Sequence, residues 1–339
     1  MRCSEVRGFN YSGSWGTSGL DLWLYHNQGL MAVEVARGKR YFPKWNVVRW
    51  WLSQDAFQRD PERFLGNLEA GLAVFARHDI LVMPVLFNRW RDPACDFGGV
   101  SLEHIVPGLS NYAQQEDLFA YPLGEQSPRE PALIERTHAA YLQGVVGTLA
   151  NDARIFAWDL CNEPLMGPYV EDPASPLRQG ELRWLTWVYR SCKHLGARQP
   201  LTIGNYPGKT VLALTEPISD ILSFHPYYVW NAPNADKAKW ESFLDDCVAF
   251  AAAKGKELLA SETVWGAVDD AKRVEVLRYT LGALRRRNLG FIVHALQHSL
   301  VADLHYPAYG PVSNPEVLHF VNPDGTLRPG HEAWNEFSD

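Results

Sequence analysis

The sequence predicts an α/β protein of the (β/α)8 barrel class. Along the 339 residues, short apolar segments typical of buried strands alternate with longer amphipathic segments typical of helices. Eight strand segments can be distinguished, and eight strand–helix units close a parallel sheet into a TIM barrel. The competing architecture, an open doubly wound sheet, usually carries a G-x-G-x-x-G motif or a P-loop, and the chain contains neither.

The predicted strands are apolar runs at 6–10, 46–52, 80–87, 154–160, 201–204, 221–224, 257–260 and 290–293. A helix is predicted after Asp60-Pro61, which supplies an N-terminal cap and a first-turn proline. Phe64, Leu68 and Leu72 mark the apolar face of that helix. Further helices are predicted at about 131–150, 180–195, 237–254 and 270–287.

Residues 91–130 interrupt this alternation. They contain Gly98-Gly99, Pro107-Gly108 and further prolines, without sustained periodicity. Because a loop of this length in a compact domain is usually functional, the segment is predicted to be a lid inserted after the third strand. No internal repeat, low-complexity tract or Gly/Ser-rich linker divides the chain, which predicts a single domain over residues 1–339.

Composition and charge argue against several classes of function. The formal net charge is −7 and no basic run occurs, so no nucleic-acid partner is expected. No apolar stretch approaches the roughly 18 residues of a membrane span, and no signal core follows Met1, which predicts a cytoplasmic protein without a membrane partner. The five cysteines lack a C-x-x-C pair and predict neither a disulfide framework nor a zinc site. The 13 tryptophans suit either sugar binding or a Trp-rich core.

Two glutamates close predicted strands. Glu163 follows the fourth strand, and Glu262 follows the seventh. In a barrel enzyme the catalytic groups lie where the strands end, so both side chains are expected at one site. Two carboxyl groups there suit the cleavage of a glycosidic bond by double displacement. One carboxyl donates a proton to the departing oxygen, and the other, ionised, attacks the anomeric carbon.

The motif Asn162-Glu163-Pro164 after an apolar strand resembles that of clan A glycoside hydrolases, above all family 5. This resemblance covers residues 8 to 300 and implies that Glu163 is the acid/base and Glu262 the nucleophile. It further implies that Arg49 orients the nucleophile and that Asn162 binds the sugar 2-hydroxyl. By the same resemblance, the sixth-strand pair contacts the substrate and its tyrosine hydrogen-bonds the nucleophile; this pair is His225 and Tyr227.

The chain departs from the family pattern at two strand ends. Family 5 members often end the third strand with His-Asn, where this chain has Phe87-Asn88 followed by Arg89-Trp90. They often place a tryptophan under the −1 sugar near the end of the eighth strand, where this chain has His294. These departures concern the sugar and not the two glutamates. Substrate contacts are therefore expected from Asn88, Trp90, His294 and Gln297.

Tryptophans in predicted loops on the catalytic side are candidate sugar platforms, with ordinary packing as the alternative for each. They are Trp15, Trp90, Trp230 and Trp265, of which Trp265 is favoured because it lies three residues after Glu262. Asp159 lies inside a strand and is interpreted as a structural residue of the barrel interior. Cys161 is interpreted as a small buried apolar residue.

The resulting prediction is a retaining β-glycosidase that needs no cofactor and acts on a β-linked, gluco- or manno-configured oligosaccharide. Exo or endo action, transglycosylation and oligomeric state stay open. One alternative is a non-catalytic carbohydrate-binding barrel, which should lack one of the two glutamates. Another is a metal-dependent hydrolase barrel using His294, His298 and His305, although the first strand lacks the His-x-His of such enzymes.

Overall fold

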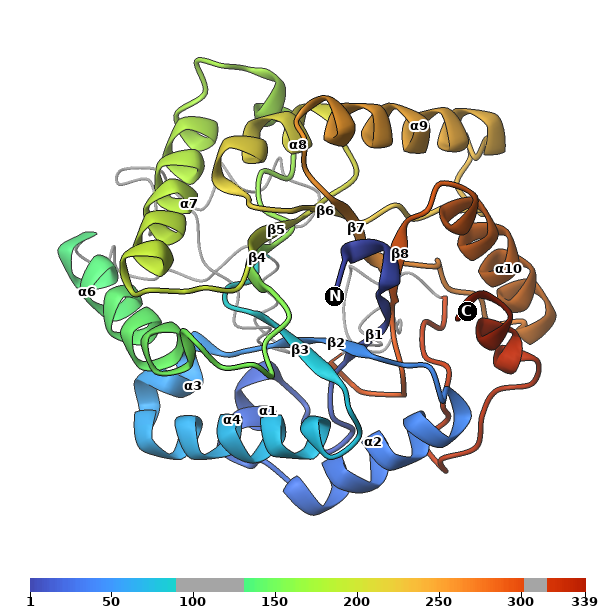
Figure 1. The fold of residues 1–339 in the computed structure, drawn as a ribbon, viewed down its shortest axis with the longest axis horizontal. Coiled ribbons are helices and arrows are strands. Elements are labelled where there is room, and N and C mark those ends of the chain that lie inside the picture. The colour runs from blue at the N-terminus through green and yellow to red at the C-terminus, as the bar shows by residue number, and fades with distance from the viewer. Residues whose placement is uncertain (90–130, 302–315) are drawn as a thin grey trace.

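The computed structural model describes residues 1–89, 131–301 and 316–339 and contains the predicted barrel. Its eight strands are parallel and follow one another in chain order, with β8 pairing to β1. The helices form an outer ring around the sheet, and the N-terminus lies over the middle of the barrel (Figure 1). The predicted fold class is therefore confirmed, whereas the predicted lid at 91–130 falls outside the described residues.

The strands are β1 Arg7–Tyr11, β2 Val47–Trp51, β3 Leu81–Val85, β4 Trp158–Asn162, β5 Leu201–Asn205, β6 Leu222–Phe224, β7 Leu258–Thr263 and β8 Gly290–Val293. The fourth strand begins later than the predicted 154–160. Arg154 is held in a turn by Asp152, whose carboxylate accepts its backbone N–H at 2.8 Å. Ile155 forms only an isolated bridge to Val82, and regular pairing with β5 starts at Trp158.

The α-helices are α1 Gly19–Leu24, α2 Gln28–Tyr41, α3 Gln54–Arg59, α4 Pro61–Ala76, α6 Pro131–Leu142, α7 Pro176–His194, α8 Lys209–Thr215, α9 Lys237–Ala253 and α10 Asp270–Arg286. Short 3-10 or π segments are η1 Cys3–Glu5, η3 Gln143–Gly147, η4 Pro168–Glu171, η5 Glu216–Ile218 and η7 His331–Phe337. Within the described ranges, no helix combines the length and apolar character needed to cross a bilayer.

Helix α2 is the longest element that the sequence pattern missed. Asn27 caps it by accepting the backbone N–H of Leu30. Its buried face combines Met31 and Val35 with a glutamate, Glu34, and so lacks the continuous apolar stripe that marks a helix in a sequence. The shorter helices α1, α3 and α8 were also not predicted, because six or seven residues carry too little periodicity.

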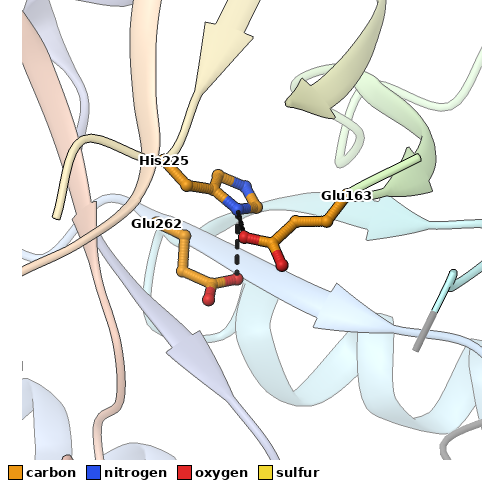
Figure 2. A group of neighbouring side chains, drawn as sticks. All are labelled: Glu163, His225 and Glu262. Atoms are coloured by element: carbon orange, nitrogen blue, oxygen red, sulfur yellow. Dashed lines mark hydrogen bonds and ion pairs between the residues drawn. The ribbon is translucent and has the colours of Figure 1, made fainter. Parts of the chain in front are cut away.

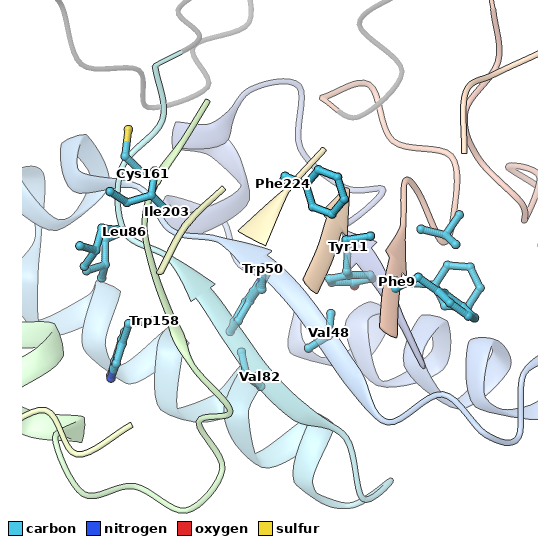
Figure 3. Close-up of a cluster of buried hydrophobic side chains, with 14 of the residues drawn as sticks. Phe9, Tyr11, Val48, Trp50, Val82, Leu86, Trp158, Cys161, Ile203 and Phe224 are labelled. Atoms are coloured by element: carbon cyan, nitrogen blue, oxygen red, sulfur yellow. The ribbon is translucent and has the colours of Figure 1, made fainter. Parts of the chain in front are cut away.

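Strand β2 shows how the sheet distributes its side chains. Val48 and Trp50 belong to the apolar layer between sheet and helices (Figure 3). Val47 faces the opposite way, into a small apolar cluster inside the barrel. Arg49 lies two residues further along, on the same inner face, and is fully buried. Because strand residues alternate between faces, β2 carries a cation into the barrel interior just above that apolar cluster.

Arg273 of α10 connects the chain segments that follow β7 and β8. This side chain is fully buried and donates to the carbonyl oxygens of Val264 and Trp265, directly after β7. It also donates to the carbonyl of His294 at 2.9 Å and to that of Leu318 at 2.7 Å. One guanidinium thus satisfies four backbone acceptors and fixes the end of β7 relative to the end of β8.

We expect Arg273→Met to lower the free energy of unfolding by about 3–5 kcal/mol, because methionine fills the space but leaves buried carbonyl groups without a donor. Denaturant titration measures the change. The matched control is Arg63→Met, which removes an exposed arginine paired with Asp60, and should cost less than about 1 kcal/mol. An equally small loss for Arg273→Met would contradict the proposed role of its hydrogen bonds.

Candidate active site

Glu163 and Glu262 meet at the carboxyl ends of the strands. Glu163 directly follows β4, and Glu262 is the penultimate residue of β7, which extends three residues further than its apolar run. One carboxylate oxygen of each lies within 4.8 Å of the other and of His225 Nδ1 (Figure 2). Glu163 is 5% exposed and Glu262 is 9% exposed. Two strand ends far apart in sequence therefore bring two nearly buried carboxyl groups to one point.

Arg49 connects this pair to the barrel interior. Its Nη1 donates to Glu262 Oε2 at 2.7 Å and to Asn10 Oδ1 at 3.1 Å. Its Nη2 donates to Asn162 Oδ1 at 2.7 Å, and its Nε donates to Asp159 Oδ2 at 2.9 Å. Each partner comes from β1, β4 or β7, so one guanidinium joins four strands. We call these five residues the Arg49 network.

Asp159 is the second anion of the Arg49 network. It is fully buried, its Oδ2 lies 2.7 Å from Arg49 Nη2, and its Oδ1 accepts the backbone N–H of Gly204 at 2.9 Å. A Cβ atom at position 204 would lie 2.7 Å from Arg49 Nη2 and from Asp159 Oδ2. Glycine is therefore required there for the ion pair to form. The interpretation of Asp159 as an interior structural residue agrees with these contacts.

Both oxygens of Glu262 are hydrogen-bonded, since Tyr227 donates its hydroxyl to Oε1 at 2.7 Å and Arg49 donates to Oε2. His294 Nδ1 lies 3.8 Å from Oε1, and His225 Nδ1 lies 3.9 Å from Oε2. Burial raises the pKa of Glu262, but the nearby charges of His225, His294 and Arg49, with the Tyr227 hydrogen bond, lower it to about 2. Glu262 is thus held in its ionised form.

Glu163 has a different set of partners. Its Oε1 lies 2.6 Å from His225 Nδ1, which is the distance of a short hydrogen bond between the carboxyl group and the imidazole. Its backbone adopts a φ of 47°, in the left-handed region, and its N–H donates to the carbonyl of Gly204 at 2.7 Å. Backbone conformations of this kind are uncommon outside glycine and occur often at functional positions.

The group formed by Glu163, His225 and Glu262 has the composition of a metal site, but the distance between His225 and Glu163 is that of a direct hydrogen bond. Two ligands of one zinc ion, each about 2.1 Å from it, lie about 3.4 Å apart in tetrahedral geometry. The 2.6 Å separation of His225 and Glu163 is shorter than that. Of the other histidines considered as metal ligands, His298 makes an edge-on contact with the ring of His319, with the ring centroids 5.1 Å apart. His305 lies outside the described residues.

Of the predicted substrate-contacting residues, the structure gathers six around the two glutamates: Arg49, Asn88, Asn162, His225, Tyr227 and His294. Asn162 Nδ2 donates to Asn88 Oδ1 at 3.0 Å, which links the ends of β3 and β4. Trp265 is half-buried with its ring 5.4 Å from that of Tyr227. Gln297 is buried beside Glu34 of α2, and Trp90 lies outside the described residues.

The other two described tryptophans proposed as platforms are engaged in packing. The indole N–H of Trp15 donates to the carbonyl of Leu22 at 3.2 Å, and that of Trp230 donates to the carbonyl of Gly266 at 2.9 Å. Both rings pack against the main hydrophobic core. The alternative interpretation of ordinary packing is therefore favoured for these two residues.

Two residues near the site were not singled out from the sequence. Asn10 is a polar residue inside an apolar strand, and that pattern is a usable signal for an inward-facing group. Trp51 shares the inner face of β2 with Arg49, whose guanidinium lies 4.9 Å from the centroid of its ring. His294 approaches Trp51 with ring centroids 5.6 Å apart. Counting two residues on from Arg49 along the strand would have identified Trp51.

Comparison with models of known protein families gives no match, and a search of curated protein sequences gives none. Solved structures do match. An endo-1,4-β-D-mannanase from Thermotoga petrophila RKU-1 superposes with a TM-score of 0.68 at 13% identity, over 98% of this chain and 99% of that chain. A GH5_18 variant from Streptomyces cattleya, in complex with Manβ1-4GlcNAc, gives 0.66 at 13%, over 98% and 80%. Bacteroides uniformis β-glucuronidase 2 gives 0.64 at 12%, over 98% and 34%.

These likenesses establish the fold, since the identities are low. A glycoside hydrolase family 5 mannosidase from Rhizomucor miehei has the same fold, with a TM-score of 0.61 at 14% identity over 98% of this chain and 92% of that chain, so the barrel that the resemblance implied is confirmed. The assignment of roles to individual residues of this chain rests on the site geometry.

The depressed pKa of Glu262 predicts how stability depends on pH. Its folded-state pKa is about 2 against an ordinary 4.5, so the stabilisation from the carboxylate is complete above about pH 4.5 and is lost as the pH falls through 2. We expect wild type to lose about 3 kcal/mol of unfolding free energy in this window relative to Glu262→Gln. Denaturant titrations at pH 5, 4, 3 and 2 measure the difference, with the exposed Glu62→Gln as control. Parallel curves for wild type and Glu262→Gln would contradict it.

Proposed function

We propose that the protein is a retaining β-glycosidase that hydrolyses β-linked oligosaccharides through a covalent glycosyl-enzyme. In this proposal Glu262 is the nucleophile and Glu163 is the general acid/base. The observation that supports it most is the meeting of two carboxyl groups in one place with opposite environments. Cationic groups surround Glu262, whereas Glu163 is hydrogen-bonded to one imidazole, that of His225.

The separation of the carboxyl groups supports retention of configuration. Inverting glycosidases hold their two carboxyl groups about 6.5–9.5 Å apart because a water molecule must fit between one of them and the sugar. Retaining enzymes hold them about 5–5.5 Å apart. Here one oxygen of Glu163 and one of Glu262 lie within 4.8 Å of each other, which is nearer to the spacing of retaining enzymes than to that of inverting ones.

Glu262 loses its negative charge when it bonds to the anomeric carbon, and the Arg49 network accommodates this loss. Arg49 keeps Asp159 as a buried counter-ion at 2.7 Å throughout. The guanidinium is therefore compensated both before and after the glycosyl-enzyme forms. Tyr227 retains its proton, because burial and then the charge of Glu262 raise the pKa of its hydroxyl well above the usual value. It therefore remains a donor to Glu262.

Glu163 performs both proton transfers of the proposed reaction. In the first step it gives its proton to the glycosidic oxygen as the leaving group departs. His225, 2.6 Å away, can then hydrogen-bond the carboxylate that results. In the second step Glu163 takes a proton from the water that attacks the glycosyl-enzyme, and the free sugar is released with its original configuration.

Asn162 is oriented to bind a sugar hydroxyl. Its Oδ1 accepts from Arg49 at 2.7 Å, and one hydrogen of its Nδ2 points to Asn88 Oδ1 at 3.0 Å. An amide nitrogen carries two hydrogens, so a second donor is left for the 2-hydroxyl of the sugar in the −1 subsite. The fixed amide supports a −1 sugar that carries a 2-hydroxyl. A gluco- or manno-configured sugar is proposed because the fold neighbours include a mannanase, a mannosidase and an enzyme in complex with Manβ1-4GlcNAc.

The nucleophile is tested with a panel of aryl β-glycosides: glucoside, mannoside, galactoside and xyloside. We expect wild type to turn over at least one of them and Glu262→Ala to lose on the order of 10⁴-fold or more in kcat. Added azide should restore turnover of Glu262→Ala and give the glycosyl azide of inverted configuration. Turnover that survives in Glu262→Ala without azide would overturn the assignment.

The acid/base is tested by leaving-group dependence. Because an activated phenol departs without a proton, we expect Glu163→Ala to retain turnover of dinitrophenyl glycosides but to lose about 10²–10⁴-fold on unactivated ones. Near-normal turnover on poor leaving groups would refute the role. Activity should also survive dialysis against EDTA, and its loss there would favour the metal-dependent hydrolase instead.

A further inference from the structure

His294 places a nearly buried imidazole beside the proposed nucleophile. It directly follows β8, is 8% exposed, and its Nδ1 lies 3.8 Å from Glu262 Oε1. Its backbone N–H donates to the carbonyl of Thr263 at 3.1 Å, and its own carbonyl accepts from Arg273 at 2.9 Å. Its ring meets that of Trp51 edge-on, with centroids 5.6 Å apart. The imidazole is thus held close to the carboxylate, yet the mechanism proposed above gives it no part in either step.

Charged and titratable groups face His294 from β2, β7 and α10 and from the segment that follows β6. Tyr227 donates its hydroxyl to Oε1 of Glu262, the oxygen nearest His294. The other oxygen, Oε2, accepts from the guanidinium of β2 at 2.7 Å and lies 3.9 Å from His225 Nδ1. The full set consists of Glu262, Tyr227, His225, Arg49 and Arg273.

The two imidazoles are the cationic groups of this set whose charge changes near neutral pH, since the ordinary pKa of imidazole is about 6.5. The two guanidiniums stay charged. Burial and then the charge of Glu262 raise the pKa of Tyr227 well above its usual value, so the phenol stays neutral. His225 is hydrogen-bonded to Glu163 at 2.6 Å and belongs to the acid/base. His294 is therefore the titratable cation placed at the nucleophile and away from the acid/base.

A positive charge on His294 opposes the first step of the proposed reaction. In that step an oxygen of Glu262 bonds to the anomeric carbon and loses its negative charge, while the sugar becomes positive in the transition state. An imidazolium 3.8 Å away stabilises the carboxylate more than the ester, and it repels the sugar. Although burial raises the pKa of Glu262, the charges of His225 and His294 are the strongest of the groups that lower it. Protonated His294 thus makes Glu262 a weaker nucleophile.

The same positive charge assists the second step. Here the bond between the anomeric carbon and Glu262 breaks, a water oxygen bonds to that carbon, and the proton of the water passes to Glu163. Negative charge returns to Glu262 as it departs, and an imidazolium beside it stabilises the departing carboxylate. His294 forms no bond and transfers no proton in either step, so its effect comes from its charge alone.

We propose that the charge of His294 acts in opposite directions on the two steps: protonated His294 slows the formation of the glycosyl-enzyme and speeds its breakdown. This inference rests on the proposed glycosidase function. A consequence is that less of the enzyme is present as glycosyl-enzyme at acidic pH than at neutral pH.

The test uses His294→Asn, which keeps an amide near the nucleophile but cannot become cationic. Formation is measured as kcat/KM on the aryl glycoside that the panel identifies. Breakdown is measured as the rate at which the isolated 2-deoxy-2-fluoroglycosyl-enzyme regains activity. Each rate is expressed as the ratio of wild type to variant, which cancels ionisations common to both, including that of Glu163. From pH 7 to pH 5 we expect the formation ratio to fall about fivefold or more and the breakdown ratio to rise about threefold or more.

His194→Gln, at the exposed last residue of α7, is the matched control and should keep both ratios near unity at every pH. His294→Gln replaces His294→Asn if the latter does not fold. Ratios that do not change with pH, or that change in the same direction, in an enzyme that still depends on Glu262 would overturn the role of His294 and leave the glycosidase function standing. Absence of Glu262-dependent turnover on every glycoside would overturn both.

Discussion

The buried charge of Arg49 is the constraint on which the rest of the site depends. A guanidinium inside a barrel is strongly destabilising unless anions and hydrogen-bond acceptors surround it. Asp159 and Glu262 supply the charge, and Asn10 and Asn162 supply the remaining acceptors. Because these partners come from three other strands, the network also fixes the register of those strands. The stability of the barrel and the arrangement of the site are thus parts of one structure.

The same network makes two chemically identical side chains different. Glu262 lies against Arg49, Tyr227 and two imidazoles, and these contacts favour the carboxylate. Glu163 lies outside the network and has His225 as its close partner. The two carboxyl groups therefore have different surroundings, which the proposed double displacement requires of its nucleophile and its acid/base. In the proposed mechanism Asp159 remains the counter-ion of Arg49 when Glu262 is neutralised.

Much of this arrangement was predictable from the sequence, and the exceptions have physical causes. Apolar runs mark the strands of a barrel clearly, so the fold and the strand ends carrying Glu163 and Glu262 could be predicted. Side-chain direction could not, since β4 is irregular between Asp159 and Asn162 and β7 between 260 and 263. The irregularity in β4 directly precedes Glu163, and the one in β7 contains Glu262.

Gly204 has a consequence for recognising distant relatives of this protein. A Cβ atom at this position would come within 3.0 Å of atoms of Arg49, Asp159 and His225. The close packing of these three side chains therefore depends on glycine. Solved neighbours share the fold at only 12–14% identity, a level at which two glutamates alone are a weak signal. A sequence pattern can also include the arginine of the second strand and a small residue near the end of the fifth strand. Such a pattern would detect relatives that keep the Arg49 network as well as the two glutamates.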